Sequence, residues 1–145
     1  MRILLSKEDM KTCDQNTIEG FGVPSCVLME RAALACVDEL YRSGAALDRV
    51  LVICGSGNNG GDGFVAADKL TEFFKTVYVY MPFGLPKTRR RANAFEKMNK
   101  AVKITEDLAI LKDCDTVIDR LFGFSFHGDV NRQTAEIIRT VNRSG

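Results

Sequence analysis

Short apolar runs rich in β-branched residues recur along the chain and alternate with longer stretches in which apolar positions follow helical spacing. The clearest run, residues 50–54, is continuously apolar, which is typical of a strand buried on both faces of a parallel sheet. Similar but shorter runs predict three more strands, at residues 77–80, 102–104 and 115–119.

Helical spacing predicts five helices before, between and after these strands. Ser6, followed by Asp9, begins a polar helix that ends near Gly20, and Ser25 begins a second helix with a broad apolar stripe. The other helices are predicted over residues 62–74, 89–100 and 134–142. Strands that alternate with helices imply right-handed crossovers. We therefore expect an α/β fold: a Rossmann-like parallel sheet flanked by helices on both faces, with two extra N-terminal helices.

Composition narrows the class of protein. The 145 residues are 46% hydrophobic and 27% charged, which suits one globular domain with its own core. A net charge of +1 argues against a protein that coats nucleic acid. No apolar window reaches the roughly 18 residues of a membrane span and no signal-peptide pattern opens the chain, so we expect a cytoplasmic protein. The five widely spaced cysteines and single histidine predict neither a zinc site nor a disulfide framework.

Residues 55–63 contain five glycines and lie between a predicted strand and a predicted helix. Gly55, Gly57 and Gly60 satisfy the G-x-G-x-x-G spacing in the strand–turn–helix context that this motif requires. Glycines there allow positive φ and let backbone N–H groups at a helix start approach an anion. A tight turn that uses glycine for packing alone is the alternative. We expect an anionic ligand at this turn, outside the carboxyl ends of the strands.

The common ligands of such a turn fit poorly. A P-loop requires a lysine where Gly60-Gly61-Asp62 stands. No acid follows the second predicted strand to hold the ribose of NAD, and a methyltransferase would favour an acid in place of Cys54. Asp62, at the predicted helix start, either caps the helix or competes with a diphosphate for the same amides. A dehydrogenase, a kinase and a methyltransferase are therefore all disfavoured.

A second candidate segment follows the last predicted strand. Asp119 ends that strand at the same sheet edge as the glycine-rich turn, where it either meets Asn59 and ligates a cation or caps the next turn. His127 is either polar surface or an acid–base group. Three aromatic residues alternate with other residues here, a pattern that suits core or lid packing: Phe122, Phe124 and Phe126.

A basic cluster precedes and opens the helix predicted over residues 89–100. It consists of Lys87, Arg89, Arg90 and Arg91. Because runs of charge are usually solvated, we expect an exposed helix face, with contact to a substrate phosphate as the alternative.

Three segments together resemble the NAD(P)H-hydrate epimerase family. They are LMERAA at residues 28–33, VICGSGNNGGDG at 52–63 and VIDRLFGFSFHGD at 117–129, and the resemblance extends over about residues 14–142. The family interconverts the R and S hydrates of NADH and NADPH, whose nicotinamide ring has gained water at C6. A partner dehydratase that accepts only the S form can then clear both. The resemblance thus implies an isomerase of nicotinamide nucleotide repair.

The resemblance also assigns roles to matching residues. Asn59 and Asp119 are expected to hold one potassium ion per subunit, and no redox cofactor is expected. Epimerisation at C6, by loss and return of the hydroxyl or by ring opening and closure, requires an acid–base group, for which His127 and Asp62 are candidates. The residues expected to bind NADH hydrate or NADPH hydrate are Asn58, Asn59, Gly60, Gly61, Asp62, Gly123, Phe124, Ser125, Phe126, His127, Gly128 and Asp129.

Two features depart from the family pattern. Arg120 stands where the family usually has a small residue, commonly alanine, and we expect its bulk to perturb the strand end. The family's Asp-x-Pro-Ser-Gly segment, with a substrate-binding aspartate and a potassium-binding serine, does not occur, so an incomplete epimerase domain over residues 1–145 is expected. A non-catalytic nucleotide- or partner-binding fragment is therefore the alternative function. The first two helices are candidates for a homodimer interface.

Overall fold

The computed structural model describes residues 4–73, 76–124 and 126–144. Its strands form a parallel sheet in the order β3-β2-β1-β4. The predicted α/β fold with two N-terminal helices is confirmed. In chain order the elements are α1 (Lys7–Gln15), the π-helical turn η1 (Asn16–Gly20), α2 (Ser25–Arg42), β1 (Arg49–Cys54), α3 (Asn58–Leu70), β2 (Thr76–Tyr80), α4 (Arg89–Lys97), β3 (Lys103–Thr105), the 3₁₀ helix η2 (Leu108–Asp113), β4 (Thr116–Arg120) and α5 (Arg132–Ser144).

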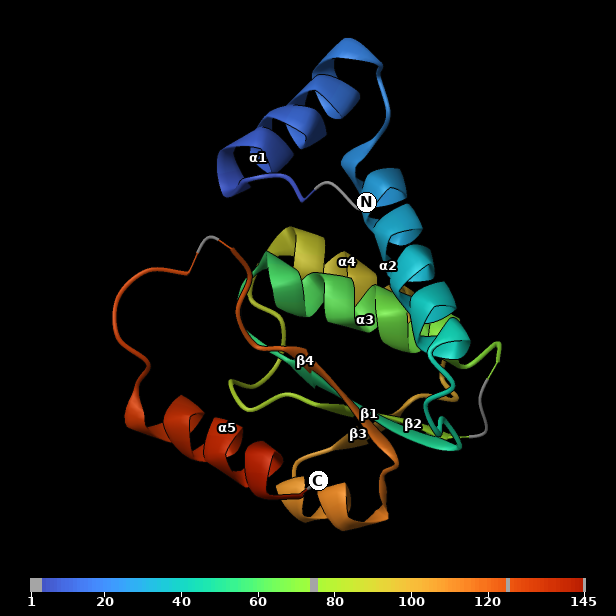
Figure 1. The fold of residues 1–145 in the computed structure, drawn as a ribbon, viewed down its shortest axis with the longest axis vertical. Coiled ribbons are helices and arrows are strands. Elements are labelled where there is room, and N and C mark those ends of the chain that lie inside the picture. Colours follow the sequence, from blue (N-terminus) through green and yellow to red (C-terminus); the bar gives the residue numbers. More distant parts are fainter. Residues whose placement is uncertain (1–3, 74–75, 125, 145) are drawn as a thin grey trace.

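Alternate residues of the inner strand β1 build a core on each face of the sheet. Val50 and Val52 pack in a cluster with residues of α2 and α3, whereas Leu51 and Ile53 pack with residues of η2 and α5. All four side chains are fully buried. Figure 1 shows α3 and α4 on one face and α5 on the other. A strand covered on both faces requires apolar residues at every position, which explains the continuous apolar run.

The N-terminal helices differ in how they are attached. In α1, Ser6 and Asp9 form a capping box, with the Asp9 N–H donating to Ser6 Oγ at 3.1 Å and the Ser6 N–H donating to the Asp9 carboxylate at 3.3 Å. Neither α1 nor η1 has a buried residue, whereas α2 buries Met29, Ala33 and Val37. Within the described ranges, no helix combines the length and apolar character needed to cross a bilayer.

Several predicted boundaries were wrong by a few residues. The helix predicted from residue 62 begins at Asn58, because Gly57 is already extended, with φ −88° and ψ −170°, and serves as the N-cap. That helix ends at Leu70, and the end predicted at Phe74 lies outside the described residues. The helix predicted over residues 89–100 ends at Lys97, because the backbone of Met98 is extended. The third strand is shifted by one residue, and η2 was not predicted.

Candidate functional site

Two glycines close the turn between β1 and α3 by backbone contact. A Cβ on Gly60 would overlap the carbonyl oxygen of Gly55, and a Cβ on Gly55 would overlap the carbonyl oxygen of Leu121. Close approach therefore requires glycine here, and the expected positive φ is not the reason. Among the described glycines, positive φ occurs only at Gly22, Gly44, Gly84 and Gly128.

The first turn of α3 lies at the carboxyl end of β1. Its residues are Asn58, Asn59 and Gly60. The N-cap is Gly57, which has no side chain to cap their amides. The Gly60 N–H donates to the Gly57 carbonyl oxygen at 3.1 Å, so an anion at this turn is suited to the amides of Asn58 and Asn59, where the helix dipole is positive. Asp62 lies in the second turn instead. The expectation that Asp62 caps the helix or competes for the first amides is therefore wrong.

Asn59 connects this turn to the segment after β4. Its Nδ2 donates a hydrogen bond to the carbonyl oxygen of Phe122 at 2.9 Å. A Cβ on Gly123 would lie only 3.3 Å from Asn59 Cβ, so the two backbones approach closely there. The structure thus brings the two predicted substrate segments together where each begins. Ser125, also predicted to bind substrate, lies outside the described residues.

The side chain of Arg120 reaches Asn59 from β4. Arg120 Nη1 donates to Asn59 Oδ1 at 3.1 Å, and Nη2 donates to Cys36 Sγ of α2 at 3.6 Å. Arg120 also keeps its place in the sheet, because it pairs with Cys54 and its carbonyl oxygen accepts from the Gly55 N–H at 2.9 Å. The expected perturbation of the strand end is therefore not observed.

Asp119 points away from Arg120, since successive side chains of a strand leave opposite faces. By register Asp119 shares the face of Ile53, and its Oδ1 accepts a hydrogen bond from the Leu121 N–H at 2.8 Å. This is the turn-capping arrangement that the sequence left open. In the described structure it is Arg120, rather than Asp119, whose side chain contacts Asn59.

Asp62 combines partial burial with nearby charges of both signs. Burial raises the pKa of its carboxyl, Arg90 and Arg120 oppose that rise in pKa, and Asp14 of α1 adds to it. Arg90 Nη2 lies 3.9 Å from Asp62 Oδ1, an oxygen that is buried and accepts no hydrogen bond from the described residues. A carboxyl with a raised pKa at the start of a helix that follows a strand's carboxyl end suits acid–base chemistry.

The segment after β4 is exposed. The rings of Phe122 and Phe126 lie 4.0 Å apart between centroids at 35°, and each is more than a third exposed. Phe124 is 56% exposed, so core packing is wrong for all three aromatic residues. Exposed aromatic rings on a segment whose Phe122 carbonyl oxygen accepts from Asn59 form a surface on which a planar ligand ring can stack.

His127 and Asp129 lie farther along the same exposed segment. Within the described part of the chain, no hydrogen bond or ion pair joins either side chain to residues 58–62. Of the two acid–base candidates, Asp62 is therefore the one that the structure places beside the glycine-rich turn.

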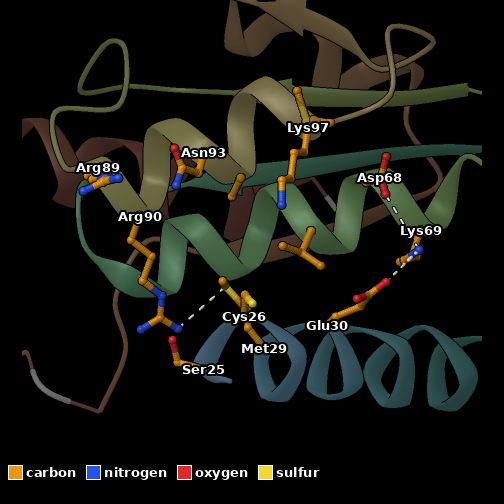
Figure 2. Close-up of a pocket in the computed structure, with 13 residues that line it drawn as sticks. Ser25, Cys26, Met29, Glu30, Asp68, Lys69, Arg89, Arg90, Asn93 and Lys97 are labelled. Atoms are coloured by element: carbon orange, nitrogen blue, oxygen red, sulfur yellow. Dashed lines mark hydrogen bonds and ion pairs between the residues drawn. The ribbon is translucent and has the colours of Figure 1, made fainter. Parts of the chain in front are cut away.

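A separate cavity of about 590 Å³ lies between α2, α3 and α4, and Figure 2 shows its lining. Arg89, Arg90 and Lys97 of α4 contribute to its wall, and none of residues 58–62 does. Arg90 joins this cavity to the site, because its Nη2 lies 3.8 Å from Met29 Sδ as well as near Asp62.

The basic cluster is only partly solvated, contrary to expectation. Arg91 is 2% exposed, and its guanidinium lies over the ring of Phe64 at 5.6 Å from the centroid. The contact of Arg90 with Asp62 was also not predicted. The available signal was topological: two successive crossover helices on one face of a sheet are neighbours, so their charged residues can meet.

Comparison with known proteins addresses the family. Residues 25–145 match the family described as YjeF-related protein N-terminus. The NAD(P)H-hydrate epimerase of Limosilactobacillus reuteri is 37% identical over 145 residues, which cover 97% of this chain and 68% of that protein. The chain belongs to the NAD(P)H-hydrate epimerase family. The family's Plasmodium vivax member is also 37% identical, over 97% of this chain and 50% of its own length.

A solved structure shares the fold of this chain. The crystal structure of yeast ynu0 matches with a TM-score of 0.77 and 22% identity, over 99% of this chain and 66% of the yeast chain. This likeness concerns the fold. The chain therefore spans about two thirds of the length of the yeast protein and of the Limosilactobacillus reuteri relative. The family resemblance expected from the sequence is confirmed, and the roles of individual residues stay predictions.

Proposed function

We propose that this chain interconverts the R and S hydrates of NADH and NADPH at the turn between β1 and α3. The observation that carries the proposal is the family's Asn-Asn-Gly-Gly-Asp-Gly stretch, which forms the start of α3 at the carboxyl edge of the sheet. The match of residues 25–145 to the family and the relatives named NAD(P)H-hydrate epimerase support it.

The geometry supports a division of labour within the site. The amides of Asn58 and Asn59 at the start of α3, with the Asn58 side chain exposed beside them, are suited to the diphosphate of the hydrate. The exposed rings of Phe124 and Phe126 are suited to stack on its planar groups. Gly123 keeps the second segment close to Asn59. The ligand would thus lie across the edge formed by the two segments.

Inversion at C6 requires a proton to be delivered and recovered. In the path through loss of the hydroxyl, an acid protonates that hydroxyl, water leaves, and water then adds to the other face and returns a proton to the same group. In the path through ring opening, the same group moves a proton between the hydroxyl and the ring nitrogen. We assign this role to Asp62, because burial raises its pKa and so favours the protonated carboxyl that either path needs.

The test couples this chain to consumption of one epimer. Pure R-NADPH hydrate is incubated with the chain and an S-specific dehydratase, and clearance is followed against spontaneous epimerisation. We expect clearance well above background from the natural chain and near background from Asp62→Asn, with a loss of roughly 100-fold or more for a missing acid–base group. Glu136→Gln, the same carboxyl-to-amide change at an exposed position of α5, is the matched control and keeps full activity.

Background clearance by the natural chain, with bound hydrate detected by calorimetry, would instead support the non-catalytic binding fragment. Full activity of Asp62→Asn would show that Asp62 is not the acid–base group, and it would not contradict the epimerase function. The proposal includes the S-specific dehydratase as functional partner. A homodimer and a cytoplasmic location stay predictions.

A further inference from the structure

The cation expected beside Asn59 does not fit the arrangement of its side chain. Potassium prefers oxygen ligands, and the resemblance assigns this role to the oxygens of Asn59 and Asp119. Asn59 Oδ1 already accepts a hydrogen bond from Arg120 Nη1 at 3.1 Å, and Asn59 Nδ2 is held by the carbonyl oxygen of Phe122 at 2.9 Å. A metal ion bound to the same oxygen would lie next to a permanently charged guanidinium. The two positive charges would repel each other.

Arg120 is held firmly in this position. Its backbone lies in β4, paired with Cys54 of β1. Its Nη2 reaches Cys36 Sγ of α2, and a Cβ on Gly63 of α3 would lie 3.2 Å from Arg120 Cβ. The base of the side chain is therefore packed against α3, and the guanidinium contacts Asn59 of α3 and Cys36 of α2. Its charge is also felt within the site, where it opposes the rise in the pKa of Asp62.

We propose that the Arg120 guanidinium takes the place of the potassium ion, so that this chain carries its site cation as a side chain and does not depend on a monovalent metal ion. The inference rests on the proposed function only for the identity of the ligand, since the contact of Arg120 with Asn59 exists without one. A fixed guanidinium supplies the same positive charge next to the first turn of α3, where an anion would bind, and it cannot be lost at low potassium.

The first measurement uses the natural chain and needs no turnover. Its Tm is compared in potassium chloride, sodium chloride and choline chloride at equal ionic strength. We expect the same Tm in all three salts. An ion bound at about ten times its dissociation constant would raise the Tm of a chain of this size by roughly 3–6 °C. A saturable rise in potassium chloride alone would overturn the proposal, whether or not the chain proves to be an epimerase.

Two variants supply the matched comparison. Arg120→Ala restores the small residue that the family pattern expects and frees Asn59 Oδ1, so we expect its Tm to rise by a few degrees in potassium chloride relative to choline chloride. Arg120→Lys keeps a cation and is expected to show no such rise. A folded Arg120→Ala variant with equal Tm in both salts would overturn the proposal. If that variant does not fold, thallium(I) binding to the natural chain, followed by thallium NMR, decides: no binding supports the proposal and saturable binding overturns it.

Discussion

Gly55 and Gly60 are needed for a steric reason that their φ angles do not reveal. The carbonyl oxygen of Gly55 occupies the space that a Cβ on Gly60 would fill. Gly57, in the same motif, has nothing within 4 Å of its ideal Cβ position. The three glycines of one sequence motif therefore differ in how strictly the fold requires them.

Gly60→Ala is expected to lower the free energy of unfolding by about 2–4 kcal/mol, because the backbone at the start of α3 has to move away from Gly55. Gly57→Ala is the matched control: its φ of −88° suits alanine, and we expect a change below about 1 kcal/mol. Urea unfolding followed by circular dichroism measures both. Equal losses in the two variants would contradict the steric argument.

The raised pKa of Asp62 predicts that the stability of the folded chain depends on pH. Burial raises its pKa in the folded state, so the folded chain binds that proton more tightly than the unfolded chain does. The charged carboxyl therefore lowers stability as pH rises from the ordinary aspartate pKa, about 4, through the raised folded value. Asp62→Asn removes this loss, so its Tm is expected to exceed that of the natural chain at neutral pH, with the difference disappearing below about pH 4.

The partner of Asp62 does not reverse this expectation. Arg90 Nη2 lies 3.9 Å from Asp62 Oδ1, and the Arg90 side chain is 43% exposed. Loss of this ion pair in Asp62→Asn therefore lowers the stability of the folded chain only slightly. Asp129→Asn, on the exposed segment, is the control and leaves Tm unchanged at both pH values. A lower Tm for Asp62→Asn at neutral pH would show that Arg90 outweighs burial.

At the scale of elements, similar capping sequences have different consequences. Asn131 precedes α5, and its Oδ1 accepts hydrogen bonds from the N–H of Thr134 at 2.9 Å and from Thr134 Oγ1 at 3.0 Å. Thr134 is fully buried, and α5 also contributes Ile137 to the core. Ser6 caps α1 in the same way, but α1 buries nothing. Tertiary packing decides whether a cap matters to the whole fold.

Asn131→Ala is expected to lower the free energy of unfolding by about 1 kcal/mol, within a range of about 0.5–2 kcal/mol for lost N-caps. Ser6→Ala is expected to change it by less than about 0.5 kcal/mol, because fraying of α1 leaves both cores intact. Both values come from urea titration of the same chain. A larger loss in Ser6→Ala than in Asn131→Ala would show that α1 is part of the cooperative unit.

At the scale of the molecule, the sheet places one thiol where only global unfolding exposes it. Cys54 ends β1 with 1% exposure, and burial raises its pKa to about 12. Three other cysteines are exposed: Cys13, Cys26 and Cys36. Cys114 is intermediate, and burial raises its pKa as well.

Ellman's reagent is therefore expected to titrate the three exposed thiols rapidly and Cys114 more slowly. Cys54 should react only at the rate at which the whole chain unfolds, because its strand is covered on both faces. In urea all five thiols should react together. Mass spectrometry identifies the modified residues. Rapid labelling of Cys54 in native buffer would contradict a closed core around β1.

The alternation of elements and the family motifs were available from the sequence alone. Strand β1, the parallel sheet and the start of the two N-terminal helices follow from patterns within one or two turns of chain, because local spacing of apolar residues decides which faces can be buried. The glycine-rich turn and the segment 123–129 could be predicted to lie at one edge of the sheet, because both follow strands and the carboxyl ends of parallel strands meet.

The contacts within that site were decided by tertiary structure. Arg120 and Asn59 are 61 positions apart in the chain, and their hydrogen bond depends on which face of β4 carries residue 120 and on where α3 begins. The burial of Arg91 over Phe64 and the approach of Arg90 to Asp62 likewise require α4 to lie against α3. Such pairings have no local signature, because side-chain direction and distance arise only when the sheet register and helix positions are set together.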